Sequence, residues 1–120
     1  MIIIGITGSI GMGKTTIARM FKRLRIPVFD SDKEVKDILE NNNNAKSEIN
    51  KIWPNVIFKE KNRRRIDKIL LSEIIFSNKL NRRKLEKIIH PLIRKRRDAF
   101  IKNNYNSYIV ALDIPLLYET

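Results

Sequence analysis

The sequence predicts an α/β fold in which a parallel β-sheet is flanked by helices. Ile2, Ile3, Ile4 and Ile6 form a β-branched run, typical of a strand that is buried on both faces. A glycine-rich segment follows, and after it a stretch with helical periodicity, so strand, loop and helix occur in the order of a right-handed βαβ unit. At 120 residues the chain is long enough for one domain with a modest core.

The glycine-rich segment fits the phosphate-binding loop motif G-x-x-x-x-G-K-[ST] from Gly8 to Thr15. Glycines let successive backbone N–H groups point at a polyphosphate and allow its close approach. Lys14 is expected to reach the β- and γ-phosphates, and the Thr15 hydroxyl to bind Mg²⁺. A helix starting near Gly13 would aim its positive end at the same anion. ATP and Mg²⁺ are therefore the expected cofactors, and the expected binding residues are Gly8, Gly11, Met12, Gly13, Lys14, Thr15 and Thr16.

The rest of the chain is predicted to be mostly helical, with two more strands. Pro91 could either kink a helix or open a new one. The basic stretch 59–65 could be a solvated loop or a collar for an anionic substrate. Strands are expected at 26–29 and 109–113, and helices at 17–24, 33–40, 45–52, 66–76, 82–89 and from 91 onward.

Acidic residues follow the second and third predicted strands. In a parallel sheet, ligands bind beyond the carboxyl ends of the strands, which is where Asp30-Ser31-Asp32 and Asp113 fall. Asp30 or Asp32 could orient or deprotonate an attacking hydroxyl, or any residue of the trio could cap the next helix. Asp113 is placed where phosphate-loop enzymes often carry an acid for Mg²⁺.

The amino-acid composition further limits the classes of ligand and partner that are expected. The formal charge of +12 favours polyanionic ligands, although lysines scattered over the surface can equally reflect biased composition. The chain has no cysteine, and its one histidine, His90, could either hydrogen-bond locally or contact substrate; a transition-metal site is not expected. The first apolar run is too short to span a membrane, so we expect a cytoplasmic protein without a membrane partner. The Asp30-Ser31-Asp32 and His90-Pro91 motifs argue against a nucleic-acid partner.

Several of these motifs together resemble the dephospho-coenzyme A kinase family, in the order and at about the spacing of that family. The phosphate loop alone would identify only a very large superfamily. The matching stretches are Gly5–Gly8 with Gly11–Thr16, Asp30-Ser31-Asp32, Ile66-Asp67-Lys68, Leu85-Glu86 with His90-Pro91-Leu92-Ile93, and Asp113-Ile114-Pro115-Leu116-Leu117-Tyr118-Glu119.

The resemblance implies transfer of the ATP γ-phosphoryl group to the ribose 3′-hydroxyl of dephospho-coenzyme A, the last step of coenzyme A synthesis. It implies a nucleotide-binding core at 1–32 and 105–120 and a helical substrate-binding region at 33–104. Asp32 then resembles the general base, with Asp30 beside it. The residues that match the substrate side of the family are Asp30, Asp32, Lys68, His90 and Glu119.

The sequence also departs from the family pattern. Lys68 stands where the family typically has arginine, which would remove a bidentate grip on a phosphate. The family continues past Glu119 into further strands and an arginine-bearing lid, so we expect a single truncated domain, 1–120, that lacks the C-terminal strands and lid. A separately encoded C-terminal half could complete it. The alternatives are a non-catalytic remnant of this kinase or another small-molecule phosphate-loop kinase.

Overall fold

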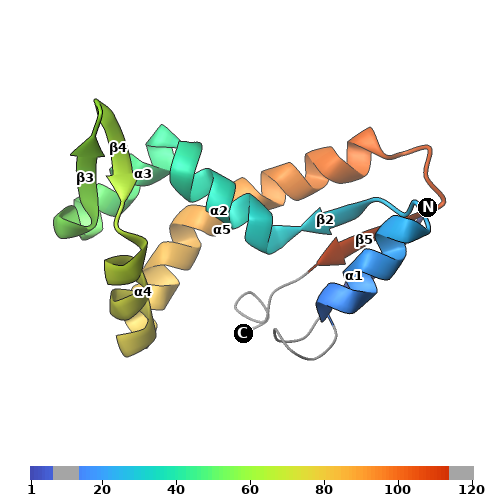
Figure 1. The fold of residues 1–120 in the computed structure, drawn as a ribbon, viewed down its shortest axis with the longest axis horizontal. Helices are drawn as coiled ribbons and strands as arrows, with labels where there is room; N and C mark the ends of the chain where they lie inside the picture. The colour runs from blue at the N-terminus through green and yellow to red at the C-terminus, as the bar shows by residue number, and fades with distance from the viewer. Residues whose placement is uncertain (7–13, 114–120) are drawn as a thin grey trace. The chain divides into compact units, whose positions relative to one another are not determined.

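The chain folds into helices and strands that form two compact units (Figure 1). The computed structural model describes residues 1–6 and 14–113, apart from the side chains of Lys14 and Thr15. The sheet unit is the described part of Met1–Glu34 and Ile93–Thr120, and the hairpin unit is Val35–Leu92. The elements are β1 (Ile2–Ile6), α1 (Lys14–Arg23), β2 (Val28–Asp30), α2 (Ser31–Asn41), α3 (Asn43–Ile52), the 3₁₀ turn η1 (Pro54–Val56), β3 (Ile57–Glu60), β4 (Arg63–Ile66), α4 (Lys68–Ser77), α5 (Lys79–Asn103) and β5 (Ile109–Asp113).

A three-stranded parallel sheet forms the centre of the sheet unit, with strand order β1-β5-β2. The last strand in sequence is thus inserted between the first two. Val110 and Ala111 of β5 are fully buried, as a central parallel strand requires. On β2, the buried Phe29 packs against Phe100 of α5, with ring centroids 5.5 Å apart and a tilt of 49°. This parallel sheet with flanking helices confirms the predicted fold class.

The hairpin unit has its own apolar core, built from Ile49, Val56, Ile66 and Leu71. Trp53 packs against this cluster as a partly buried residue. Asn42, which lies between α2 and α3, caps α3, because its side chain accepts a hydrogen bond from the Ala45 amide at 2.9 Å. Short helices therefore gain most of their stability here from packing and capping rather than from length.

The stretch 59–65, for which a loop was one expectation, forms most of a β-hairpin. β3 and β4 are antiparallel, and Glu60 pairs with Arg63 so that only Lys61 and Asn62 lie between the strands. Both of these residues have positive φ, 51° and 63°, which is the conformation of a type I′ turn. Lysine is depleted in strands, and the stretch 59–65 has no β-branched or aromatic residue, so its composition concealed the hairpin.

Helix α5 is longer than the sequence suggested. Lys79–Asn103 is one helix that contains Pro91, so this proline does not open a new helix. Proline removes one backbone donor and usually costs about 3 kcal/mol inside a helix. The Asn78 side chain begins the helix by accepting from the amides of Leu80 and Asn81.

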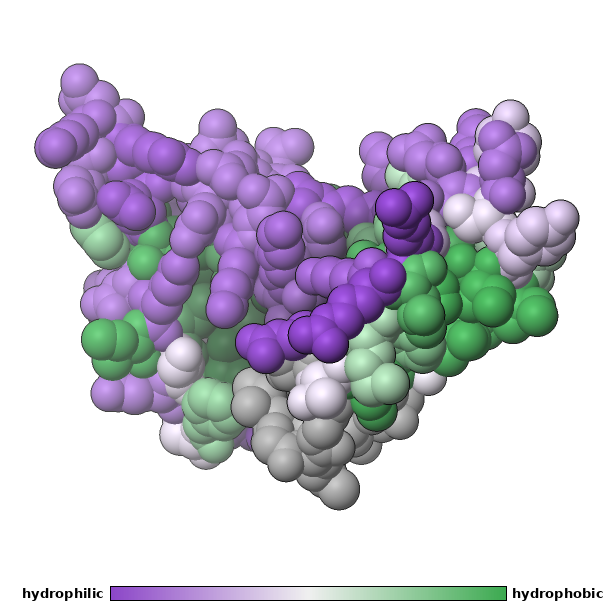
Figure 2. Space-filling view, turned by 45° about the vertical axis from the view of Figure 1, so that its right-hand side comes forward, coloured by the Kyte–Doolittle hydropathy of each residue, from purple (hydrophilic) through white to green (hydrophobic). Residues whose placement is uncertain are grey.

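Apolar side chains remain on the surface of the sheet unit. Ile2 and Ile3 of β1 are more than half exposed, and so are Met20 and Leu24, on and just after α1. The space-filling view shows green apolar areas beside the purple polar surface (Figure 2). Among the described helices, none is long and apolar enough to cross a membrane.

The exposed edge of β1 leads to a prediction about self-association. Within the described sheet β1 pairs with β5 alone, so its other side offers backbone N–H and C=O groups to another strand. The 120-residue chain, produced by itself, should associate more strongly as salt rises, because screening of its +12 charge shortens to about 8 Å at physiological ionic strength. Sedimentation velocity across a salt series measures this. Ile3→Lys should suppress the association, and a parent chain that stays monomeric at every ionic strength would contradict the prediction.

Candidate functional site

The strand register brings three positions together at the carboxyl edge of the sheet. Asp113, the last residue of β5, is paired with Ile6 of β1 on one side and with Asp30 of β2 on the other. Neighbouring strands lie about 4.8 Å apart, so two acidic residues sit side by side at this edge. Ile6 also ends β1 two residues before Gly8, the first residue of the predicted phosphate loop. The register therefore agrees with the expectation that the phosphate loop and the carboxylates lie at the same edge of the sheet.

Asp30 is the residue that caps the start of α2, a role for which the sequence offered Asp30, Ser31 and Asp32 as alternatives. Its Oδ1 accepts a hydrogen bond from the Lys33 amide at 3.2 Å, so Asp30 caps the start of α2. Ser31 is buried as the first residue of α2, and Asp32, the second, is exposed. The cap fixes the direction of the Asp30 carboxylate and places Asp32 on the first turn of the helix.

Asp113 is a buried acid, with 8% of its surface exposed. It ends a strand whose other central residues, Val110 to Leu112, are also buried. A carboxylate in such a position is costly unless compensated by hydrogen bonds, cations or metal ions. Mg²⁺ is commonly bound through one or two carboxylates together with substrate phosphates. In the described residues, no three His, Asp or Glu side chains converge into a complete metal cage.

The predicted phosphate loop itself is outside the described residues, as are Gly8, Gly11, Met12, Gly13 and Glu119. The elements that flank the loop are described: β1 ends at Ile6, and α1 begins at Lys14. The first turn of α1 carries no acidic residue, so its positive end is not neutralised from within the helix. Thr16, on this first turn, is exposed. The strand and helix occur in the order that a phosphate loop requires.

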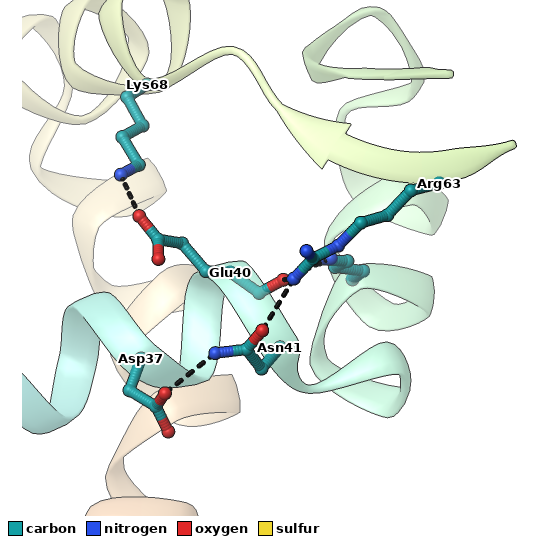
Figure 3. Close-up of polar contacts among 6 residues, drawn as sticks. Asp37, Glu40, Asn41, Arg63 and Lys68 are labelled. Atoms are coloured by element: carbon teal, nitrogen blue, oxygen red, sulfur yellow. Dashed lines mark hydrogen bonds and ion pairs between the residues drawn. The ribbon is translucent and has the colours of Figure 1, made fainter. Parts of the chain in front are cut away.

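The predicted substrate residues Lys68 and His90 both belong to the hairpin unit. His90 is half-buried within α5. Lys68 begins α4, and its Nζ donates to the Glu40 carboxylate at 2.7 Å (Figure 3). This hydrogen bond and the charge of Lys68 are the main causes that lower the pKa of the Glu40 carboxyl.

The structure adds a cationic residue, Lys46, that sequence reasoning missed. Lys46 is 1% exposed, and its Nζ donates to two backbone carbonyls, Glu40 O and Arg64 O. Burial is the main cause that lowers the pKa of Lys46, followed by the charges of Arg63, Arg64 and Arg65. The signal in the sequence was its spacing, since Lys46 lies three residues before the buried Ile49 and thus on the inner face of α3.

The order of strand, loop and helix, with carboxylates at the carboxyl edge, defines the class of this fold as the phosphate-loop type of α/β protein. A model of the dephospho-CoA kinase (CoaE) family matches residues 2–120. The chain belongs to the dephospho-CoA kinase family.

Relatives and solved structures agree with this membership. The dephospho-CoA kinases of Zymomonas mobilis and Agrobacterium fabrum are each 40% identical to the chain, over 119 and 122 residues. The alignments cover 99% and 100% of this chain but 58% and 60% of those relatives. The chain thus spans about three-fifths of the length of these curated relatives.

Among solved structures, TT1252 from Thermus thermophilus has a TM-score of 0.75 at 32% identity, and dephospho-CoA kinase from Campylobacter jejuni has 0.69 at 30%. Each comparison covers 98% of this chain and 58% of the other.

The capping role of Asp30 can be tested by stability. Asp30→Ala removes the acceptor for the Lys33 amide and should lower the free energy of unfolding by about 1 kcal/mol. Asp30→Asn keeps a capping oxygen and should cost less. Urea unfolding of both variants beside the parent protein measures the difference. Equal losses in the two variants would show that the side chain does not act as a cap.

Proposed function

We propose that this chain serves the ATP-dependent phosphorylation of the ribose 3′-hydroxyl of dephospho-coenzyme A. The observation that carries the proposal is the family match over residues 2–120. The register that aligns Ile6, Asp113 and Asp30 supports it, because it gathers the loop-bearing strand and two carboxylates at one edge. The reaction uses small charged substrates, and we place it in the cytoplasm, without a membrane or nucleic-acid partner.

In this proposal the segment between β1 and α1 holds ATP. Backbone amides of the glycine-rich loop surround the phosphates, and Lys14 donates to the β- and γ-phosphates. The start of α1 adds the positive end of its dipole, with no acidic side chain in its first turn to oppose it. The residues assigned to the nucleotide are Gly8, Gly11, Met12, Gly13, Lys14, Thr15 and Thr16.

Oxygen donors at the same edge suit Mg²⁺. We assign the ion to the Thr15 hydroxyl and the Asp113 carboxylate, and hard oxygen ligands of this kind are those that Mg²⁺ prefers. The burial of Asp113 at the end of β5 supports the assignment, because an acid in that position gains from a nearby cation. When bound, Mg²⁺ offsets the negative charge that develops on the phosphate oxygens during transfer.

Asp32 is proposed as the general base. It accepts the proton of the ribose 3′-hydroxyl while that oxygen forms a bond to the γ-phosphorus. The bond from the γ-phosphorus to the bridging oxygen breaks, and ADP leaves with the electron pair. Asp30 lies beside the reacting groups, and its hydrogen bond to the Lys33 amide orients the first turn of α2, on which Asp32 stands.

The substrate side is assigned to the helical region 33–104, with Lys68 and His90, and to Glu119 beyond β5. The 2.7 Å pair between Lys68 and Glu40 means that Lys68 is already held in one direction before a phosphate reaches it. A lysine acts as a point charge, so its grip on a phosphate is less directional than that of arginine.

Two variants test the proposed chemistry. Asp32→Asn should lower turnover by roughly 10²–10⁴-fold, the usual contribution of an aligned base, while ATP affinity changes little. Lys14→Ala should remove transfer and weaken ATP binding, because its charge acts on the bound phosphates. Transfer from labelled ATP to dephospho-coenzyme A, with calorimetric titration of ATP, measures both effects.

The assay needs two controls. Nucleoside monophosphates, DNA and RNA are offered as competing acceptors, and transfer to one of them in preference to dephospho-coenzyme A would contradict the proposed substrate. A second sample joins this chain to the remaining part of the Zymomonas mobilis relative, so that the variants can be compared at full family length. If Asp30→Asn slows transfer more than Asp32→Asn, the base has been assigned to the wrong carboxylate.

A further inference from the structure

The hairpin unit contains a pocket of about 590 Å³ inside the region assigned to the substrate, and of its lining residues Lys68 alone has been given a role above. It lies between the end of α2, one face of the β3–β4 hairpin and the start of α4, and Lys46, Phe58, Arg63, Arg65 and Lys68 are among its lining residues. Pockets of about 300–1,000 Å³ hold small organic ligands. The size therefore suits an organic molecule better than a bare ion.

Lys46 brings a buried positive charge to this pocket. Its ammonium has three donors, of which two are bound by the neutral carbonyls of Glu40 and Arg64. In the described residues no carboxylate lies within ion-pair distance of it. A buried charge bonded to neutral groups alone is poorly compensated. The charges of Arg63, Arg64 and Arg65 lower the pKa of Lys46 further, and the charge of Glu40 opposes them with the smallest effect of the four.

Arg63 repeats this pattern at the same point. Its Nη2 donates to the Glu40 carbonyl oxygen at 2.9 Å and to Asn41 Oδ1, both of them neutral acceptors (Figure 3). Two cations, Lys46 and Arg63, thus converge on one carbonyl oxygen at the end of α2. Repulsion between them would be relieved by an anion in the pocket.

The three acids that line the pocket are already engaged. Glu40 is paired with Lys68 at 2.7 Å, and Glu60 lies 3.7 Å from Arg65. Asp67 caps α4 by accepting from the Leu70 amide at 3.1 Å. The charge of Glu40 also acts on Lys46 and Arg63, but this one carboxylate is shared with Lys68 and Arg65, so it cannot offset all four cations.

The opposite wall adds backbone donors and an apolar surface. Lys68 and Ile69 are the first two residues of α4 and line the pocket, and amides in this position have no acceptor within their helix. Phe58 lies on the same hairpin face as Arg63 and Arg65 and is 44% exposed. Its ring can cover the apolar part of a ligand whose charge is held by the cations.

We propose that this pocket binds the phosphate or diphosphate group of an organic phosphate ester. Lys46 and Arg63 bind the anion, the first amides of α4 complete its hydrogen bonds, and Phe58 contacts the organic part. Phosphate oxygens accept several strong charge-assisted hydrogen bonds, which matches this set of donors. The ligand could be the diphosphate of dephospho-coenzyme A, which would rest on the proposed function, or another phosphorylated metabolite.

Titration calorimetry with pyrophosphate and with dephospho-coenzyme A tests the proposal. All samples carry Lys14→Ala, so that the phosphate loop does not contribute the signal. Arg63→Gln should weaken binding at least about tenfold, the usual effect of losing a charged hydrogen bond. Lys59→Gln removes a charge from the same hairpin outside the pocket lining and should leave affinity within about twofold, as a rim charge remote from the ligand would. Tighter binding of dephospho-coenzyme A identifies the substrate as the ligand, and equal binding identifies a general phosphate site.

Lys46→Gln separates anion binding from a purely structural role. The glutamine amide keeps two N–H donors for the Glu40 and Arg64 carbonyls, on a side chain one bond shorter, and has no charge, so pyrophosphate affinity should fall in the folded variant. Arg63 is exposed, so its variant remains informative even if Lys46→Gln fails to fold. No binding of either probe, or equal binding by the Arg63→Gln and Lys59→Gln samples, would overturn the proposal. Neither of these two results depends on whether the protein transfers phosphate to dephospho-coenzyme A.

Discussion

The parallel register of β1, β5 and β2 is the constraint on which the proposed chemistry depends. Because Asp113 pairs with both Ile6 and Asp30, the ends of all three strands lie at one edge. A slip of one residue would turn the side chains of a strand to the opposite face and separate the acids from the loop. The buried Phe29, Val110 and Leu112 oppose such a slip, since it would expose apolar surface at about 25 cal/mol per Å².

The hairpin unit holds many positively charged side chains close together. Its hairpin carries five basic residues and one acid between Ile57 and Ile66, yet Lys46 is buried against it. Backbone carbonyls at the end of α2 and in β4 bind this ammonium, and the negative end of the α2 dipole favours it there. The Glu40 carbonyl also accepts a hydrogen bond from Arg63, so two cations meet at the end of α2.

The sequence predicted the parts of the structure that depend on short-range patterns. The β-branched run, the apolar strand that ends at Asp113 and the acids at the strand ends are enough to locate the carboxyl edge of the sheet. The hairpin was missed because Lys61 and Asn62 form a type I′ turn without glycine, between strands rich in arginine. Lys46 was missed although it lies three residues before Ile49, because lysines are usually exposed and the carbonyls that bind it are 6 and 18 residues away. The roles of Asp32 and Glu119 stay predictions.

Paramagnetic broadening by Mn²⁺ in place of Mg²⁺ tests most directly whether the carboxyl edge of the sheet is the nucleotide site. In the presence of ATP, amide signals of Ile6, Asp30 and Asp113 should broaden more than those of Ile2 and Ile109, which lie at the other ends of β1 and β5. The effect should require ATP, because the proposed ion is held partly by phosphates. Equal broadening along the strands, or stronger broadening at Ile2 and Ile109, would contradict the account.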